Sequence, residues 1–146
     1  MIVLVTGSNG LLGQKILENL RKNDYTIIAT SKGKNRVKQD NYYTYESLDI
    51  TQEEEVNRIL NLYSPDVVFN TAAMTNVDLC ENERAICDKL NVDAVGLLAN
   101  SCLKIDAHLI HISTDFVFDG KDGPYSENDI PNPLSYYGKS KYKSEK

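Results

Sequence analysis

The chain has 146 residues, a length that suits one domain with an ordinary hydrophobic core. Apolar residues make up 41% of the sequence and charged residues 25%, which is the composition of a soluble globular protein. The formal net charge of −5 argues against broad nucleic-acid binding, and no apolar run approaches the roughly 20 residues of a membrane-spanning helix.

The first stretch of the chain combines a strand, a glycine turn and a helix. Residues 2–5 are all apolar, which predicts a buried parallel strand. Glycines follow at Gly7, Gly10 and Gly13, and apolar residues then recur at helical spacing over residues 10–22. Such a unit gathers backbone N–H groups and the positive end of a helix at one point, which suits a phosphate.

Strands and helices alternate along the rest of the chain. Strands are expected at residues 25–30, 43–47, 66–70 and 108–112. Thr51 and Glu54 have the spacing of a capping box, so a helix is expected to begin at Thr51 and to end at Ser64 before Pro65. A long helix is expected over residues 81–103 with Ile86, Leu90 and Leu97 in the core, and a last helix from Ser135 that is still in progress at Lys146.

This alternation predicts an α/β fold, a doubly wound parallel sheet of the NAD(P)-binding Rossmann type. Right-handed crossovers give the strand order 3-2-1-4-5, with ligands beyond the carboxyl ends of the strands. Residues 1–146 are interpreted as this single domain. The absence of a sixth strand predicts that the sequence is truncated and that a C-terminal substrate domain lies outside it.

The glycine turn predicts a dinucleotide site. Gly7 permits a tight turn, Gly10 allows a pyrophosphate to approach the backbone, and Gly13 allows the helix to pack on the strand. The spacing GxxGxxG is one residue longer in its first gap than the usual fingerprint, but it lies between a clear strand and a clear helix, as the motif requires.

The end of the second strand bears on the choice of cofactor. NAD-binding sites usually carry an acidic residue there, whereas this chain has Ser31 and Lys32, with Lys34 and Arg36 nearby. The absence of a carboxylate and the presence of cations favour NADP(H) over NAD(H). If residues 31–38 are only a solvated basic loop, the preference between the two cofactors stays open.

Two further segments follow strands at the same edge of the sheet. Asp49 and Ile50 come after the third strand, where the carboxylate can hold the adenine edge or can merely precede the Thr51 cap. Residues 70–73, Asn-Thr-Ala-Ala, are small enough for a dinucleotide to lie flat across the sheet, although tight packing alone would also explain them.

Tyr137 and Lys141 are four residues apart and share one face of the last helix. A nearby ammonium favours phenolate, and lowering a tyrosine pKa from about 10 toward 7 takes about 4 kcal/mol. Such a tyrosine can exchange a proton with a carbonyl or hydroxyl while a hydride moves, and Ser113 or Thr114 can hydrogen-bond the same oxygen. The spacing alone is weak evidence, because Tyr142 and Lys146 also match it.

Several motifs together resemble the extended short-chain dehydrogenase/reductases, and within them the dTDP-4-dehydrorhamnose reductases, the RmlD-like branch. The motifs are Thr6–Gly13, Asp49–Thr51, Asn70–Ala73, Thr75–Asp78, Ser113–Gly120, Pro124–Glu127 and Tyr137–Lys141, and together they span nearly the whole chain. The family reduces the 4-keto group of a dTDP-sugar with NAD(P)H.

The resemblance implies roles for individual residues. Thr114, Tyr137 and Lys141 would be catalytic, and Asp115, with Thr114, would contact the nucleotide-sugar substrate. The residues that would touch the cofactor are Gly10, Leu11, Leu12, Asp49, Ile50, Ala72, Ala73 and Met74.

Two other readings of the resemblance stay open. The family includes non-catalytic regulatory subunits similar to the methionine adenosyltransferase β subunit, and the superfamily includes sugar-nucleotide epimerases and dehydratases. Phe116 stands where the reductases often have tyrosine and where dehydratases carry glutamate, so a substrate hydrogen bond would be missing and dehydration is disfavoured.

The remaining residues of interest have structural interpretations. Three cysteines without a CxxC pair predict buried free thiols in a reducing cytoplasm. His108 and His111 lie in a strand without metal-ligand spacing, so no metal is expected. The sequence leaves a homo-oligomer open.

Overall fold

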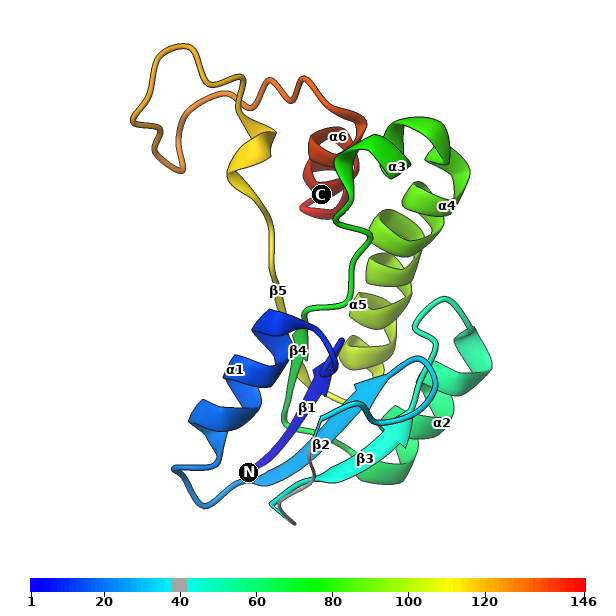
Figure 1. Cartoon of the computed structure of the whole chain (residues 1–146). Coiled ribbons are helices and arrows are strands. Elements are labelled where there is room, and N and C mark those ends of the chain that lie inside the picture. The colour runs from blue at the N-terminus through cyan, green and yellow to red at the C-terminus, as the bar shows by residue number, and fades with distance from the viewer. Residues whose placement is uncertain (38–41) are drawn as a thin grey trace. The chain divides into compact units, whose positions relative to one another are not determined.

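The computed structural model describes residues 1–37 and 42–146, so Lys38 at the end of the predicted basic loop lies outside the described residues. Two compact units make up the chain (Figure 1). The first consists of Met1–Ala73 with Ala94–Ile112, and the second of Met74–Asp93 with Ser113–Lys146.

The first unit is built on a five-stranded parallel sheet with the predicted order β3-β2-β1-β4-β5. The strands are β1 (Ile2–Thr6), β2 (Thr26–Ser31), β3 (Thr44–Ser47), β4 (Val67–Asn70) and β5 (His108–His111). Four successive residues of β1 are buried, because the sheet is covered on both faces. The doubly wound α/β fold is therefore confirmed.

Three helices belong to this unit: α1 (Leu11–Leu20), α2 (Glu53–Tyr63) and α5 (Ala94–Lys104). Leu17 of α1 packs with Val3 and Val5 of β1, while α2 packs against α5 (Figure 1). The end of α2 is as predicted, since Ser64 adopts a left-handed conformation, φ 41°, directly before Pro65.

The predicted capping box of α2 is wrong. The helix begins at Glu53, and Gln52 at the N-cap makes no side-chain capping bond. Thr51 lies one residue before this N-cap; its hydroxyl donates to Asp49 Oδ1 over 2.7 Å and accepts from Gln52 Nε2 over 3.2 Å. Glu55 instead connects α2 to the preceding loop, because its carboxylate accepts a hydrogen bond from the Asp49 N–H over 2.8 Å.

The predicted continuous helix over residues 81–103 is also wrong. The chain forms α3 (Val77–Asn82), α4 (Arg84–Asp88) and a π-helical segment (Lys89–Asp93) before α5. Glu83 interrupts the first two with φ −118° and ψ 53°.

These interruptions change which residues are buried in this part of the chain. Ile86, predicted to lie in the core, is 57% exposed, whereas its neighbour Cys87 is fully buried. Leu90 and Leu97 are half-buried, and Asn91 and Leu98 beside them are buried instead. Both the break at Glu83 and the wider π turn shift the phase of the apolar face by about one residue.

The second unit contains α3, α4, a short 3₁₀ turn (Asp115–Val117) and α6 (Tyr136–Ser144). Helix α6 begins beside Ser135, as predicted, and Ser135 caps it by accepting a hydrogen bond from the Gly138 N–H over 3.1 Å. The expectation that this helix continues to Lys146 is wrong, because it ends at Ser144. All three cysteines are buried free thiols, as predicted.

No helix within residues 1–37 and 42–146 is long and apolar enough to cross a membrane.

Candidate functional site

In the first unit, the glycine turn joins β1 to α1 under tight steric constraints. Gly7 has φ +66°, and a Cβ added there would lie 2.7 Å from the Ala72 nitrogen. Thr6 and Thr71 strengthen this junction: the Thr6 hydroxyl donates to Asn70 Oδ1, and the Thr71 hydroxyl donates to the Thr6 carbonyl, each over 2.6 Å. The ends of β1 and β4 are thereby fixed side by side, with only small residues following β4.

The N-terminus of α1 has features that suit an anion. Gly10 at the N-cap makes no side-chain capping bond, and the first turn contains no acidic residue. Among the residues that the structure describes, no side chain caps this turn, and its N–H groups lie at the positive end of the helix dipole. Leu11 and Leu12 in this turn are 79% and 45% exposed, so their side chains do not contribute to the core.

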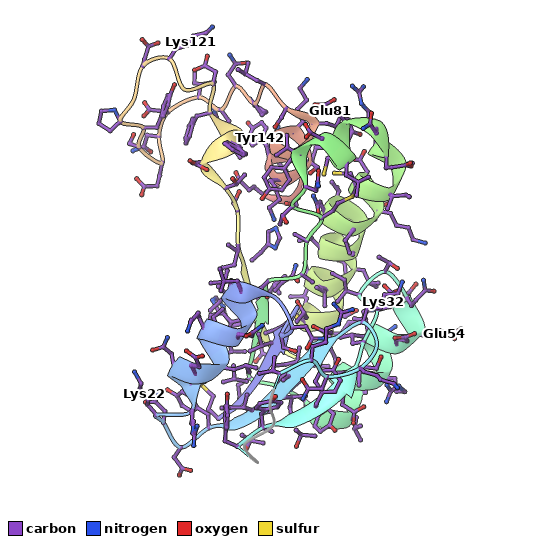
Figure 2. The ribbon with its side chains drawn as sticks, viewed as in Figure 1. Lys22, Lys32, Glu54, Glu81, Lys121 and Tyr142 are labelled. Atoms are coloured by element: carbon purple, nitrogen blue, oxygen red, sulfur yellow. The ribbon has the colours of Figure 1, made fainter. Side chains whose placement is uncertain are left out.

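The charges after β2 and β3 differ from the sequence-based expectation. Lys32 lies on the loop after β2 (Figure 2). Its Nζ lies 2.7 Å from Asp49 Oδ2, so a carboxylate does reach the end of β2, from the loop after β3. This contact raises the pKa of Lys32. Partial burial alone would raise the pKa of Asp49, but hydrogen bonds from Lys32 and Thr51 outweigh it and lower that pKa. Ile50, predicted to touch a cofactor, has its side chain buried in the core.

In the second unit, Thr114 and Tyr137 come together although they are far apart in the sequence. Thr114 caps the 3₁₀ turn through a 3.2 Å hydrogen bond from the Phe116 N–H. Burial raises the pKa of Tyr137, while a hydrogen bond with Thr114 acts in the lowering direction. The ring of Phe116 meets that of Tyr137 edge to face, with centroids 6.0 Å apart. The aromatic contact thus orients the phenol beside Thr114.

Lys141 is a buried cation, with only 2% of its surface exposed. Burial lowers its pKa to about 8, against a smaller raising effect of Glu145. The net shift of the Tyr137 pKa is upward, opposite to the downward shift expected from the nearby ammonium, because burial dominates. Tyr142 and Lys146, the second pair with the same spacing, form a surface cation–π contact, with the Lys146 Nζ 4.3 Å from the ring centroid.

Asn91 is a functional candidate that the sequence analysis missed. This amide is 1% exposed; it accepts a hydrogen bond from the Met74 N–H over 2.8 Å and donates to the Met74 carbonyl over 3.0 Å. It also donates to Ser140 Oγ over 3.0 Å, and the Ser140 hydroxyl donates to the Tyr137 carbonyl over 2.8 Å. The sequence does not single it out, because Asn82 and Asn100 lie in the same expected helix.

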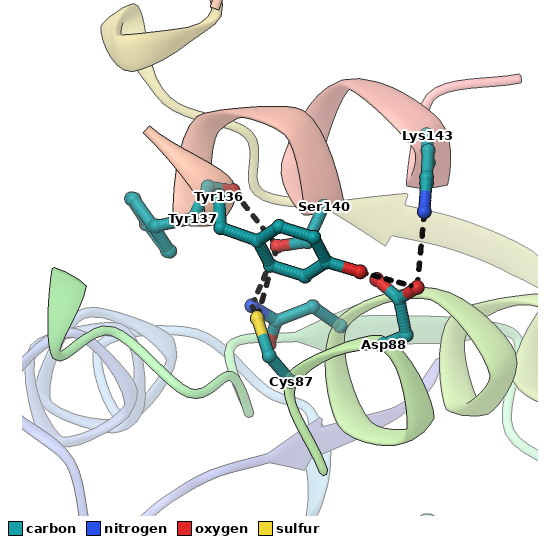
Figure 3. A network of polar contacts seen from close by, with 7 residues as sticks. Cys87, Asp88, Tyr136, Tyr137, Ser140 and Lys143 are labelled. Atoms are coloured by element: carbon teal, nitrogen blue, oxygen red, sulfur yellow. Dashed lines mark hydrogen bonds and ion pairs between the residues drawn. The ribbon is translucent and has the colours of Figure 1, made fainter. Parts of the chain in front are cut away.

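Figure 3 shows the surroundings of this network. The Cys87 thiol donates to Ser140 Oγ over 3.4 Å. Beside it, Asp88 Oδ2 accepts from the Tyr136 hydroxyl over 2.8 Å and pairs with Lys143 over 2.9 Å. Helix α6 is therefore fixed to α4 by polar contacts on either side of Tyr137.

A pocket of about 440 Å³ lies within the second unit. Apolar and aromatic side chains form most of its wall, among them Val77, Phe116, Phe118 and Leu134, and Asp115 also lines it. The predicted substrate contact Asp115 thus faces a cavity large enough for a small ring. Within residues 1–37 and 42–146 no group of three or more metal-ligating side chains is present.

A sequence-family profile described as "RmlD substrate binding domain" matches residues 1–146. The chain belongs to this family. The resemblance to the extended short-chain dehydrogenase/reductases, reached from the motifs, is thereby confirmed.

Curated relatives of the RmlD-family chain fall into two functional groups. The methionine adenosyltransferase 2 subunit beta of Bos taurus is 38% identical over 144 residues, which cover 99% of this chain and 41% of that protein. The dTDP-4-dehydrorhamnose reductase of Aggregatibacter actinomycetemcomitans is 36% identical over 146 residues, covering 99% and 45%. The chain therefore spans less than half the length of these two relatives.

Solved structures agree with the fold. The dTDP-4-dehydrorhamnose reductase of Clostridium acetobutylicum is 38% identical with a TM-score of 0.85, over 99% of this chain and 48% of that one. The Bacillus anthracis enzyme of the same name, solved in complex with NADP, is 32% identical with a TM-score of 0.82, over 99% and 47%.

Proposed function

We propose that the protein is an NADP(H)-dependent reductase that acts on the 4-keto group of a nucleotide-activated deoxysugar. In this proposal residues 1–146 form the NAD(P)-binding Rossmann domain, and the substrate domain lies outside them. The names of the reductases from A. actinomycetemcomitans and C. acetobutylicum support the reaction, and the NADP complex of the B. anthracis enzyme supports the cofactor.

The glycine turn fits a dinucleotide. The uncapped N-terminus of α1, without an acidic side chain in its first turn, would bind the pyrophosphate through backbone N–H groups. Of the other predicted contacts, Ser31, Ala72 and Ala73 lie at the ends of β2 and β4. When bound, the cofactor supplies the hydride for reduction.

The observation that carries the proposal is the buried Lys141 one helical turn after Tyr137, with Thr114 hydrogen-bonded to the tyrosine. In this assignment Tyr137 gives its phenolic proton to the keto oxygen as the product hydroxyl forms. Thr114 donates a hydrogen bond to the same oxygen and holds it in line with the phenol. The Lys141 ammonium stabilises the phenolate that remains, an interaction that strengthens as the negative charge develops.

Substitution of Tyr137 by phenylalanine tests the assignment. In the full-length protein, Tyr137→Phe should lower kcat for reduction of dTDP-4-dehydrorhamnose by at least about a hundredfold, the usual size of a general-acid contribution. The Kd of NADPH, measured by calorimetry, should stay within a factor of about two of the wild type. Tyr142→Phe is the matched control and should retain turnover, and a Tyr137→Phe variant that keeps wild-type kcat contradicts the assignment.

A regulatory subunit is the second candidate, and the observation that favours it is the 38% identity to the methionine adenosyltransferase 2 subunit beta of Bos taurus. Under this alternative, the full-length protein would bind the methionine adenosyltransferase of its own source organism and change its kinetics. Size-exclusion chromatography of the mixture separates the two functions. The regulatory function would be favoured if the two proteins form a stable complex, if Tyr137→Phe leaves this complex intact, and if the wild-type protein shows no reductase turnover.

A further inference from the structure

The loop after β2 is held at its first half by side chains of β3. The Gly33 N–H donates to Ser47 Oγ over 3.1 Å. The Tyr45 hydroxyl lies 2.7 Å from the Gly33 carbonyl and 3.1 Å from the Ser31 carbonyl. Because Gly33 adopts φ +81°, the chain reverses at this point and brings the residues that follow back toward the glycine turn.

Asn9, inside the glycine turn, holds the second half of the same loop. Its Nδ2 donates to the Lys34 carbonyl over 3.0 Å, and its Oδ1 accepts from the Arg36 N–H over 2.9 Å. Its own N–H donates to Ser31 Oγ over 3.0 Å. One side chain therefore links the turn that would bind the pyrophosphate to the loop that carries the basic residues.

The charges of this loop are not equivalent. Lys32 is already neutralised by Asp49 at 2.7 Å, and Asp49 is held in place by Thr51. Lys34 and Arg36 are exposed, and within residues 1–37 and 42–146 neither is paired with a carboxylate. Among the described residues of this loop, the positive charge that remains available to an anion thus lies on the two residues whose backbone Asn9 holds.

We infer that Asn9 is a positioning residue for cofactor selectivity: by fixing Lys34 and Arg36 beside the glycine turn, it sets the preference for a 2′-phosphorylated dinucleotide, NADP(H), over NAD(H). The inference rests on the proposed dinucleotide-binding function. Asn9 itself contacts loop backbone, and the two cations reach the 2′-phosphate. Loops held in place before binding lose less conformational entropy when they order around a ligand, which is why loss of the two hydrogen bonds should weaken the phosphate contact.

The selectivity ratio, Kd for NADH divided by Kd for NADPH, is the measurement that isolates this role. In the full-length protein, Asn9→Leu removes both hydrogen bonds in a side chain of similar size, and the ratio should fall about tenfold, the loss expected for one charge-assisted contact. Arg36→Ala should also lower the ratio. Adding Asn9→Leu to Arg36→Ala should lower it by less than Asn9→Leu does in the wild type, because only Lys34 is then left for Asn9 to position. Asn19→Leu is the matched control, because the Asn19 side chain donates to the Lys15 carbonyl inside α1 and not to the loop.

Fragments of the cofactor separate selectivity from general damage. Adenosine 2′,5′-bisphosphate should lose affinity for the Asn9→Leu variant, whereas ADP, which lacks the 2′-phosphate, should bind as it does to the wild type. If Asn9→Leu does not fold by circular dichroism, Asn9→Ala serves in its place, since it introduces no new contact. An unchanged selectivity ratio, or an equal loss for both fragments, overturns the inference while leaving dinucleotide binding intact. A wild-type protein that binds neither dinucleotide overturns the proposed function, and this inference with it.

Discussion

Replacement of Gly13 by alanine tests how closely α1 approaches the glycine turn. A Cβ at this position would lie 2.5 Å from the Gly7 carbonyl oxygen and 2.8 Å from the Ser8 Cα. Ordinary van der Waals contact begins at 3.4 Å, so the first turn of α1 would have to move by about 0.9 Å, the difference between 3.4 and 2.5 Å. Both opposing atoms are backbone, and no rotamer change can relieve the overlap.

The magnitude follows from two opposing effects. Overpacking of this kind costs about 1–3 kcal/mol, and more where backbone meets backbone. The higher helix propensity of alanine over glycine stabilises the folded state by about 1 kcal/mol. We therefore expect Gly13→Ala to lower the free energy of unfolding by about 2 kcal/mol. Gly96 is the matched control, because it lies inside α5 with nothing within 4 Å of an added Cβ. Gly96→Ala should raise the free energy of unfolding by about 0.5–1 kcal/mol.

Urea unfolding followed by circular dichroism measures both variants. The midpoints should shift in opposite directions while the dependence on urea concentration stays unchanged, because neither substitution alters the surface exposed on unfolding. Equal midpoints for Gly13→Ala and the wild type would refute the reasoning, since they would mean that α1 is free to move away from β1. If Gly96→Ala also lowered the free energy of unfolding, the loss in Gly13→Ala could not be assigned to the overlap with Gly7 and Ser8.

Two other predictions concern buried polar side chains of the second unit. Asn91→Leu should lower the free energy of unfolding by about 2 kcal/mol, because it leaves the Met74 N–H without its acceptor and removes one of two donors to the Met74 carbonyl. Asn19→Leu, assayed by the same urea unfolding, should change this free energy by less than about 0.5 kcal/mol. Lys141 has a pKa of about 8, below the ordinary 10.5, so the unfolded chain binds more protons between these pH values and stability should rise with pH across this window. Relative to Lys141→Met, the free energy of unfolding of the wild type should rise by at most about 3 kcal/mol from pH 7.5 to 10.5. A difference in this free energy between the two proteins that does not change with pH would argue that the ammonium is hydrated.

The sequence predicted those features that depend on neighbouring residues. Uninterrupted apolar runs identified the strands, and the glycines between strand and helix identified the turn, because each feature is determined within a few residues. The start of the last helix near Ser135 and the end of the second helix at Ser64 were predicted for the same reason. The strand order then followed from general rules of connection.

Features that depend on distant residues were missed or misjudged. Asp49 reaches Lys32 from another strand, so the end of β2 looked free of carboxylates in the sequence. Thr51 has the right spacing for a cap, but the helix begins one residue later and the Thr51 side chain contacts Asp49 and Gln52 instead. The direction of the Tyr137 pKa shift depends on burial, which spacing does not reveal.

The π-helical segment has a consequence for how this part of the chain tolerates insertions and deletions. A π turn contains one residue more than an α turn, so deleting a residue from Lys89–Asp93 would make the helix more regular. The same deletion would rotate the residues on one side of it by about 100°. Either Asn91 would turn away from Met74, or Ala94 and Leu98 would leave the core. The rotational register of the helix is therefore fixed by its π-helical segment. In a library of single-residue deletions, the fraction of variants that fold should be lowest within Lys89–Asp93.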